Sequence, residues 1–453
     1  MAFHYQYVDK YVVSARCSSP LHIGSAMGGK EEVLLHPVDR EPFIQSSGIA
    51  GVLRNVSAKI SREDTERLFG ASHFEENTNA NDFAGRVKVS DGRFKMDTVK
   101  MELRPRVAID SRTGSVCAKE KEGSGVSAGQ KFETEYIGAG AEFSFDVYLY
   151  RMEDTGDREM LEQIFGELKA EHIQIGGQKT NGSGYIQLKE ILFKEFDMTD
   201  PDSRKEWAEE DELPAAAYQS IAGRLCTGNR FGAAYTFTVT ARTEGNLLVK
   251  GISADAFGKD APDSVNMRNA GGDFIIPGSS LKGSLRNRMT FIAGNLGKSS
   301  LLKEIFGYTG KGRNSGASGR ISVKDTVVGN QKDNEAADLQ HRIHIDKFTG
   351  GVIHGSLFAE KNVHGSLTME ISIQESEHAD AAAGLLLLAL RDLAAGLMNL
   401  GSGYSVGKGY IHVIDIEIRR GEETVLINWE KQEMKGSEQI IHDCLQKLKT
   451  SEG

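Results

Sequence analysis

A possible anion-binding element begins at Pro277. Residues 277–286 read PGSSLKGSLR, which places Ser279 and Ser280 at the start of a run with helical apolar spacing and Lys282 and Arg286 in its first turns. The N-terminus of a helix presents unpaired backbone N–H groups and the positive end of the helix dipole, so with two cations beside it this element could bind phosphate. A plain turn with a helix cap accounts equally well for the same residues.

A second candidate is a glycine-rich turn between a predicted helix and a predicted strand. Residues 401–409 read GSGYSVGKG, and residues 176–184 read GGQKTNGSG. Glycine is needed there either because backbone amides meet a phosphate or because the helix and the strand pack closely. The spacing does not match a Walker A loop, and the position after a helix excludes a Rossmann fingerprint. The candidate binding residues of the two turns are Gly401, Gly403, Gly407, Lys408, Gly409, Lys179, Gly182 and Gly184.

Both elements occur twice because the second half of the chain repeats the first. Five blocks recur in the same order with offsets of 225 to 237 residues, which indicates a duplicated domain and excludes a solenoid of short repeats. We call the two halves copy 1 and copy 2. Copy 1 has Ser47 and Arg54 where copy 2 has Ser279 and Arg286, but Ala50 replaces Lys282. The matched blocks are 47–55 with 279–287, 68–70 with 305–307, 84–87 with 318–321, 106–114 with 342–350, and 182–186 with 407–411.

These repeats predict two domains with the same mixture of elements. We place the first domain at residues 1–195, an acidic connector at 196–213 and the second domain at 214–453. Ser47 and Ser279 are the predicted N-caps of the first helices. Strands and helices mixed in this order predict an α+β sandwich with helices on one face of each sheet. The predicted strands are 11–16, 143–150, 236–242 and 365–373, and the predicted helices are 49–60, 158–170, 281–292 and 381–400.

Composition is that of a folded protein with two cores. The chain has 453 residues, 39% of them hydrophobic and 26% charged, with 51 glycines, 8 prolines and a net charge of −10. An acidic total does not exclude nucleic-acid binding, because the position of the cations decides where phosphates bind. The four cysteines lie too far apart for a zinc motif and no secretory signal precedes them, so we expect a cytoplasmic protein with reduced thiols. Arg391 and Asp392 interrupt the most apolar stretch, which therefore reads as a packed helix rather than a membrane span.

The pairing of the 276–286 element with the 401–409 turn resembles the RAMP superfamily, and most closely the repeated backbone subunit of type III CRISPR effector complexes. The match is strong in copy 2 and degraded but ordered in copy 1, and a tandem fusion of this kind resembles the fused subunits of type III-D complexes. The resemblance implies a ferredoxin-like, RRM-related core in each copy, with a thumb hairpin inserted at 111–133 and at 347–360. Ordinary β-hairpin insertions would account for the same segments.

The resemblance also implies where RNA is bound and cut. The serines, cations and glycines named above become guide-RNA contacts, and an aspartate in the loop before residues 277–286 becomes the catalytic residue. Asp263 fits the family's Asp-Ser pattern best, with Asp260 and, more weakly, Asp255 nearby. Such an aspartate could hold a divalent metal ion, magnesium or manganese, or orient the ribose 2′-hydroxyl for in-line attack on its own phosphate. Solvated loop acids are the alternative.

Copy 1 departs from this pattern because its corresponding loop, residues 23–33, contains no aspartate. Glu31 or Glu32 could substitute, although the longer side chain places the carboxylate further out. We therefore expect copy 1 to bind RNA without cutting it.

The leading hypothesis is a subunit of an antiviral CRISPR ribonucleoprotein that binds guide RNA, cleaves single-stranded target RNA and contacts other effector subunits. A non-catalytic structural subunit is one alternative. A guide-processing endoribonuclease of the same superfamily is another, and it requires a histidine or a similar base near residues 401–409. A ferredoxin-like protein that binds a small molecule is a third.

Overall fold

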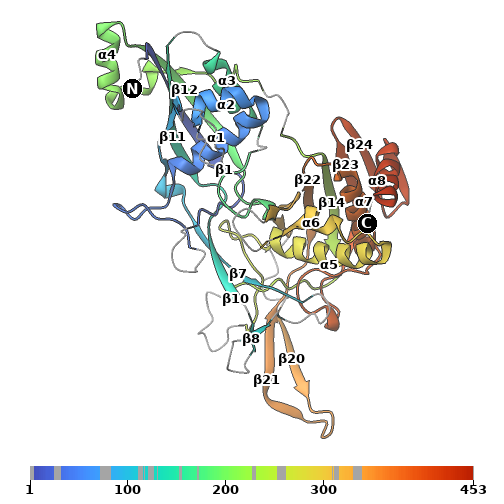
Figure 1. Cartoon of the computed structure of the whole chain (residues 1–453). Coiled ribbons are helices and arrows are strands. Elements are labelled where there is room, and N and C mark those ends of the chain that lie inside the picture. Colours follow the sequence, from blue (N-terminus) through green and yellow to red (C-terminus); the bar gives the residue numbers. More distant parts are fainter. Residues whose placement is uncertain are drawn as a thin grey trace. The chain divides into compact units, whose positions relative to one another are not determined.

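The computed structural model of the chain describes residues 5–24, 32–71, 83–110, 116, 118–120, 127–129, 131–152, 156–170, 173–226, 231–252, 262–308, 310, 316–329 and 339–451. These residues form two compact units, drawn in Figure 1. Unit 1 comprises Met1–Met101, Tyr136–Lys179 and Ser183–Phe231, and unit 2 comprises Glu102–Glu135, Thr180–Gly182 and Gly232–Gly453. Unit 1 thus holds most of copy 1, while unit 2 holds copy 2 together with two short segments of copy 1.

The centre of unit 1 is an antiparallel sheet in which β1 (Tyr7–Cys17) lies between β11 (Glu142–Arg151) and β12 (Ile186–Asp197). Buried and less buried residues alternate along β11, as expected for a strand with one face in the core. Helices α1 (Ser46–Ile60), α2 (Arg62–Phe69) and α3 (Asp157–Lys169) pack together against the sheet (Figure 1). The remaining strands of this sheet are β2 (Phe43–Ile44), β5 (Val87–Val89), β6 (Gly92–Phe94) and β13 (Gln219–Ser220).

The segment predicted as an acidic connector packs onto unit 1. It contains α4 (Pro201–Ala208), from which the Trp207 ring contacts the rings of Phe196 and Tyr148 at centroid distances of 5.2 and 5.7 Å. Glu210 accepts an ion pair from Lys10 of β1. The predicted boundaries follow the sequence repeat and stay a prediction, whereas the compact units divide after Phe231. The short elements of this unit are β3 (Gly70–Ala71), β4 (Phe83–Ala84), η1 (Met96–Thr98), η2 (Lys179–Asn181, which continues into unit 2), η3 (Glu210–Glu212) and η4 (Ala215–Ala217).

Unit 2 repeats this arrangement. Its first strand, β14 (Tyr235–Thr243), lies antiparallel between β22 (Ser366–Ile373) and β23 (Ile411–Arg420), as β1 does in unit 1. Helices α5 (Gly278–Leu296) and α7 (Ala379–Ala394) pack together, and α8 (Gln439–Thr450) packs on α7 (Figure 1). The other elements are β15 (Ile275–Ile276), α6 (Leu301–Phe306), β16 (Gly307–Tyr308), β17 (Ala317–Ser318), β18 (Ile321–Val323), β19 (Thr326–Val327), β24 (Glu423–Asn428), β25 (Glu433–Gly436) and η5 (Tyr404–Val406). The expected α+β class with two repeated domains is confirmed.

A two-stranded hairpin interrupts each copy. In copy 1, β7 (Met101–Val107) pairs with β10 (Lys131–Ile137), and β8 (Ala118–Glu120) pairs with β9 (Ser127–Gly129). In copy 2, β20 (Leu339–Ile345) pairs with β21 (Val352–Lys361), and Figure 1 shows this hairpin extending away from the six-stranded sheet of unit 2. Both hairpins begin before the segments predicted as thumbs. The matched motifs at 106–110 and 342–346 start within the first strand of each hairpin, β7 and β20.

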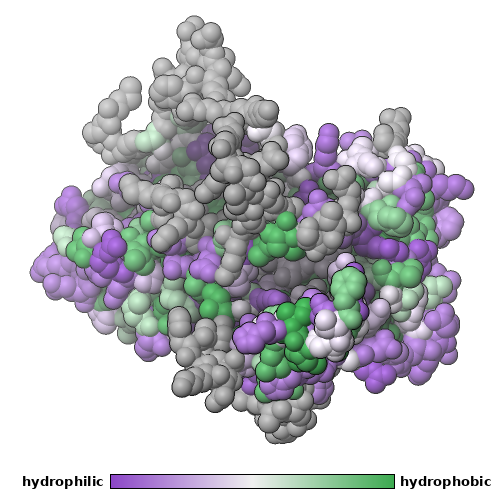
Figure 2. All heavy atoms as spheres, turned by 90° about the horizontal axis from the view of Figure 1, so that it is seen from below, coloured by the Kyte–Doolittle hydropathy of each residue, from purple (hydrophilic) through white to green (hydrophobic). Residues whose placement is uncertain are grey.

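Exposed apolar side chains are scattered rather than gathered into one large patch on the face drawn in Figure 2, where hydrophobic residues are interspersed with hydrophilic ones. Among the described residues, no helix has the length and apolar character needed to cross a membrane.

Candidate nucleic-acid interface

The first turn of α5 is where the sequence predicts a phosphate site, and most of its amides have partners inside the protein. The N–H of Gly278 donates to Oδ1 of Asp325 at 2.8 Å. The N–H groups of Ser280 and Leu281 donate back to the carbonyl of Pro277 at 2.9 and 3.1 Å. A carboxylate from the turn between β18 and β19 therefore caps this helix, and only part of the N-terminus is left for a ligand.

Helix α1 is capped in the same way. The N–H of Ser46 donates to Oδ1 of Asp91 at 2.7 Å, and Asp91 precedes β6 just as Asp325 precedes β19. The predicted N-caps Ser47 and Ser279 are wrong: Gln45 and Pro277 hold the N-cap positions, and both serines lie inside the helices. The reason is tertiary, because an aspartate some 45 residues further along the chain supplies the oxygen that a local serine was expected to supply.

A cluster of three cations lies beside the first turns of α5. Burial and, to a smaller extent, the positive charges of Arg286 and Arg106 together lower the pKa of Lys282 to about 8. Within the described residues neither Lys282 nor Arg286 has a carboxylate partner, and the Arg286 guanidinium lies 5.5 Å from the centre of the Phe306 ring. The positive charges of Lys282 and Arg286, which no described carboxylate neutralises, favour binding of an anion from outside.

Arg106 was not among the predicted site residues. It lies on the part of β7 that belongs to unit 2, with its guanidinium 5.1 Å from the Phe132 ring. Its sequence signal was the repeat itself, since Arg106 and Arg342 open matched blocks. Nothing in the local sequence places Arg106 near Lys282, because 176 residues separate the two.

The same position in copy 1 carries less charge. Arg54 is exposed on α1, but Ala50 stands where Lys282 stands in α5. Ser47 is also exposed at the start of this helix. The two copies therefore present the same helix start with different numbers of cations.

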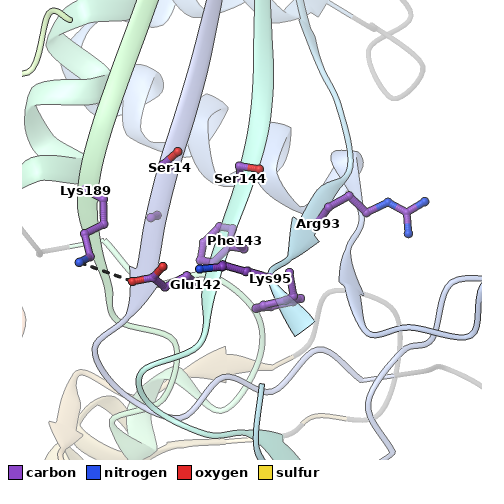
Figure 3. A pocket seen from close by; sticks show the side chains of 9 residues that line it. Ser14, Arg93, Lys95, Glu142, Phe143, Ser144 and Lys189 are labelled. Carbon is purple, nitrogen blue, oxygen red and sulfur yellow. Dashed lines mark ion pairs between the residues drawn. The ribbon is translucent and has the colours of Figure 1, made fainter. Parts of the chain in front are cut away.

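A shallow pocket of unit 1, shown in Figure 3, offers a second group of cations. It has a volume of about 450 Å³ and lies against the strands that carry Ser14 and Ser144. Each of its cations has a carboxylate partner: Lys189 lies 3.5 Å from Glu142, Arg93 lies 2.8 Å from Asp39, and Lys95 lies 3.7 Å from Asp97. Figure 3 also shows the Arg93 side chain pointing away from Lys189. This neutralised pocket is a weaker anion site than the cluster beside α5.

In the glycine turn of copy 2, backbone packing accounts for two of the glycines. Gly401 and Gly409 have positive φ angles of 78° and 79°, and a Cβ on them would meet the carbonyls of Leu248 and Leu400 at 2.6 and 2.0 Å. Gly403 also has a positive φ and lies against the Lys408 side chain. Gly407 faces open space, so this part of the turn is the most accessible to a ligand.

Lys408, predicted to contact RNA, points into the protein. Its side chain is buried, and its Nζ donates to Oε2 of Glu360 at 2.5 Å and to Oδ1 of Asn362 at 2.7 Å. Arg342 donates to the other carboxylate oxygen of Glu360 at 2.5 Å. Burial raises the pKa of Glu360, but the hydrogen bonds and charges of Lys408 and Arg342 outweigh burial and lower it. The Lys408 charge thus stabilises the base of the β20–β21 hairpin.

The glycine turn of copy 1 is used for packing in two directions. A Cβ on Gly184 would meet the carbonyl of Ile175 at 2.0 Å, which closes the turn on itself. Gly182 belongs to the short segment Thr180–Gly182 of unit 2. A Cβ on it would meet the carbonyl of Val323 at 2.5 Å. Burial lowers the pKa of Lys179. Close packing, which was the alternative reading of these glycines, accounts for both of them.

Asp263 lies at the end of the loop that precedes α5, beside the return strand of the hairpin. Its Oδ2 accepts the N–H of Ala359 at 2.7 Å, and Ser264 pairs with Glu360 in a parallel bridge. The carboxylate is exposed, and Oδ1 has no partner among the described residues. The loop acid predicted to be catalytic is thus held at the base of the β20–β21 hairpin.

Of the other acids predicted to be catalytic, the structure describes only Glu32. Asp255, Asp260 and Glu31 lie outside the described residues, and Glu32 is exposed. No group of three or more histidine, cysteine, aspartate or glutamate side chains in the described part of the chain could hold a metal ion. A single carboxylate such as Asp263 does not make a metal site by itself.

Comparison with protein-family models shows which family the chain resembles. A family model described as the RAMP superfamily matches residues 14–187 and 238–412, that is, both copies including the helix starts and the glycine turns. No curated protein matches the chain.

Proposed function

The chain belongs to the RAMP superfamily, as a tandem of two RAMP domains, and from that premise we propose that it is a backbone subunit of a type III CRISPR ribonucleoprotein. Membership indicates a CRISPR-associated RNA-binding subunit. The proposal adds that the subunit holds the guide RNA, cleaves complementary target RNA from copy 2, and belongs to a type III-D complex in which both copies are fused.

The observation that carries RNA binding is the cation cluster beside α5. Lys282 has a pKa of about 8 because it is partly buried next to Arg286 and Arg106, and within the described residues Lys282 and Arg286 have no carboxylate partner. A phosphate of RNA would supply the missing negative charge and raise the pKa of Lys282 again. Ser279 and Gly407 lie on surfaces that a ligand can reach and can add polar contacts.

The test replaces the two cations of α5. We expect the double variant Lys282→Ala, Arg286→Ala to bind single-stranded guide RNA roughly 10- to 100-fold more weakly near physiological salt, and the slope of log affinity against log salt to fall by about 1.4 because two phosphate contacts are lost. The matched control, Lys431→Ala with Lys435→Ala, removes two exposed charges of unit 2 and should bind like the unmodified chain. Equal affinities of both variants would remove this site.

Cleavage is proposed to use Asp263. Its Oδ2 is held by the Ala359 amide, so Oδ1 is available to accept a hydrogen bond from a ribose 2′-hydroxyl. The 2′-oxygen would attack the adjacent phosphorus, its proton would pass to the carboxylate or to water, and the bond to the 5′-oxygen would break as that oxygen takes up a proton from water. The products would be a 2′,3′-cyclic phosphate and a 5′-hydroxyl. As the alternative role, Asp263 would be one ligand of a divalent cation, magnesium or manganese, and the other ligands would have to come from groups other than this carboxylate.

The Asp263→Asn variant in the assembled complex tests this role, because asparagine keeps an oxygen for the Ala359 amide but cannot take a proton. Target cleavage at the position covered by copy 2 should fall by about 100-fold or more, while guide binding stays unchanged. Glu422→Gln, at an exposed site of unit 2, is the charge-matched control. Chelation with EDTA followed by addition of magnesium or manganese tests the cofactor separately.

A non-catalytic structural subunit is the second candidate, and one observation favours it. The hydrogen bond from Ala359 gives Asp263 a structural role in tying the loop to the hairpin. If Asp263→Asn cuts target RNA at the unmodified rate, the non-catalytic function is the correct one for this residue.

A further inference from the structure

The base of the β20–β21 hairpin holds the loop that carries Asp263. On β21 the N–H of Ala359 donates to Oδ2 of Asp263 at 2.7 Å. Two residues further along the strand, the N–H of Lys361 donates to the carbonyl of Ser264 at 2.9 Å. These two bonds lie on either side of Glu360 in the chain. The position of the Asp263 carboxylate therefore follows the position of β21 at this point.

The side chain of Glu360 anchors β21 inside the protein. Its Oε2 accepts a hydrogen bond from Nζ of Lys408 at 2.5 Å, and its Oε1 accepts one from Arg342. The side chains of Glu360 and Lys408 are only 6% and 5% exposed, so this charge-assisted bond is shielded from water. Nζ of Lys408 also donates to Oδ1 of Asn362 at 2.7 Å. The lysine thus contacts β21 at two positions next to the residues that hold the Asp263 loop.

The other end of Lys408 is built into the glycine turn of copy 2. Its N–H donates to the carbonyl of Gly403 at 3.1 Å, and a Cβ on Gly403 would meet Cδ of the lysine at 3.0 Å. The absence of a side chain at Gly403 leaves the room that the lysine needs to reach the hairpin. The turn is therefore a platform from which one buried cation holds β21.

Copy 1 has no charged pair at the matching positions. The offset of 225 at the glycine turn matches Lys408 with Ser183, and an offset of 226 matches Glu360 with Thr134. The second offset follows from the bridges beside the two hairpin bases, Leu21–Ile137 in copy 1 and Leu247–Val363 in copy 2. Ser183 and Thr134 are buried but uncharged. The copy 1 hairpin still pairs β7 with β10, so closing a hairpin base does not require the charged pair. The pair occurs in the copy whose loop contains an aspartate.

We propose that Lys408 is a positioning residue of the cleavage site in copy 2. By holding Glu360, Lys408 would keep the Ala359 amide on Oδ2 of Asp263 and so leave Oδ1 directed toward the 2′-hydroxyl of the target RNA. This inference rests on the proposed cleavage function and adds a residue that acts on the reaction only through the position of Asp263.

The first test is hydrogen exchange in the purified full-length chain without RNA. Lys408→Met keeps the approximate length of the side chain and removes its charge, so Glu360 loses one of its two cations. We expect the Ala359 amide to exchange at least about tenfold faster, because its protection depends on the bond to Asp263. An unchanged exchange rate at Ala359 would overturn the proposal.

The second test measures cleavage by the assembled complex at the position covered by copy 2. In Lys408→Met the rate constant at saturating target RNA should fall by about tenfold, since a small displacement of a catalytic group costs a factor of this order. The target concentration at half-saturation and the affinity for guide RNA should each stay within about twofold, because the lysine side chain points away from RNA. A weaker guide affinity with a smaller salt slope would make Lys408 an RNA contact and contradict the proposal.

Arg288→Met is the matched control for a merely structural role. Arg288 on α5 lies 2.7 Å from Asp392, a carboxylate that is 4% exposed. One further arginine remains with that carboxylate, as one remains with Glu360. The two variants should lose similar stability in thermal unfolding, but only Lys408→Met should lose cleavage rate. Equal losses of rate would assign the effect of Lys408 to stability and reject its role in positioning.

This inference and the proposed cleavage fail separately. If Asp263→Asn cuts target RNA at the unmodified rate, the cleavage assignment fails and Lys408 has no reaction to serve, even where the exchange of Ala359 responds to it. If Asp263→Asn stops cleavage while Lys408→Met changes neither the exchange nor the rate, the cleavage assignment stands and only the positioning role is lost.

Discussion

Helices α1 and α5 begin alike, each with an amide bound to an aspartate from the following strand pair, and they differ in the charges around that start. At the start of α5 the aspartate also binds Arg104, and the first turns of the helix carry Lys282 and Arg286. In α1 the aspartate binds only the helix within the described residues, and Ala50 replaces the lysine. The duplication preserved the scaffold that positions a site while the charges, which determine what binds there, diverged.

The two glycine turns extend this comparison. Both turns use glycine for close backbone packing, at Gly184 against Ile175 and at Gly409 against Leu400. The turn of copy 2 also contains Lys408, which forms an ion pair with Glu360 at the base of the hairpin. A cation in a turn that recurs in both copies can therefore stabilise the hairpin rather than bind a ligand, and its burial shows which of the two it does.

The largest expected difference between the two helix starts is in stability. Arg104→Ala leaves the buried Glu102 and the partly buried Asp325 without their cation, which we expect to lower the free energy of unfolding of unit 2 by about 3 kcal/mol. Asp91→Asn in unit 1 should cost less than about 1 kcal/mol, since it loses no ion pair. Hydrogen exchange of α5 and α1 measures the two units separately, and equal losses in both would remove the distinction.

The next largest effect is on the pH dependence of RNA binding. Lys282 has a pKa lowered to about 8, so raising the pH from 7 to 9 removes its charge in the free protein. Bound phosphate favours the charged form, so affinity for single-stranded RNA should fall by up to about tenfold over this range. The sign follows because the protonated form is the one that binds.

Lys282→Arg should remove this dependence, because arginine stays charged throughout. Fluorescence anisotropy at several pH values makes the comparison. A decrease of the same size in Lys282→Arg would assign the pH dependence to another group.

The smallest effect concerns the missing cation of copy 1. Ala50→Lys restores the residue found in copy 2, and we expect it to raise the affinity for single-stranded RNA by about two- to fivefold with a steeper salt dependence, as one added phosphate contact would. Ala50→Met adds similar bulk without charge and should leave the affinity unchanged. An unchanged affinity for Ala50→Lys would mean that α1 does not face RNA.

Much of the architecture could be predicted from local sequence. Five repeated blocks established the duplication without a family match, and the apolar spacing of residues 281–292 found the core of α5, which extends from Gly278 to Leu296. The exposed Arg54 and Arg286 follow from the same periodicity, because each lies off the buried stripe of its helix. The sequence identified Lys282 and Asp263 as candidate site residues, but it did not predict the contacts that their side chains make.

The sequence by itself determined that there are two similar α+β domains of a RAMP tandem, because periodicity and repeated motifs are properties of neighbouring residues. The tertiary structure alone decided which charges are free. Asp325 binds both α5 and Arg104, Lys408 pairs with Glu360, and Asp91 has one carboxylate oxygen without a partner among the described residues. Ion pairs and caps join residues tens to hundreds of positions apart, and burial sets their strength, so no local pattern encodes them.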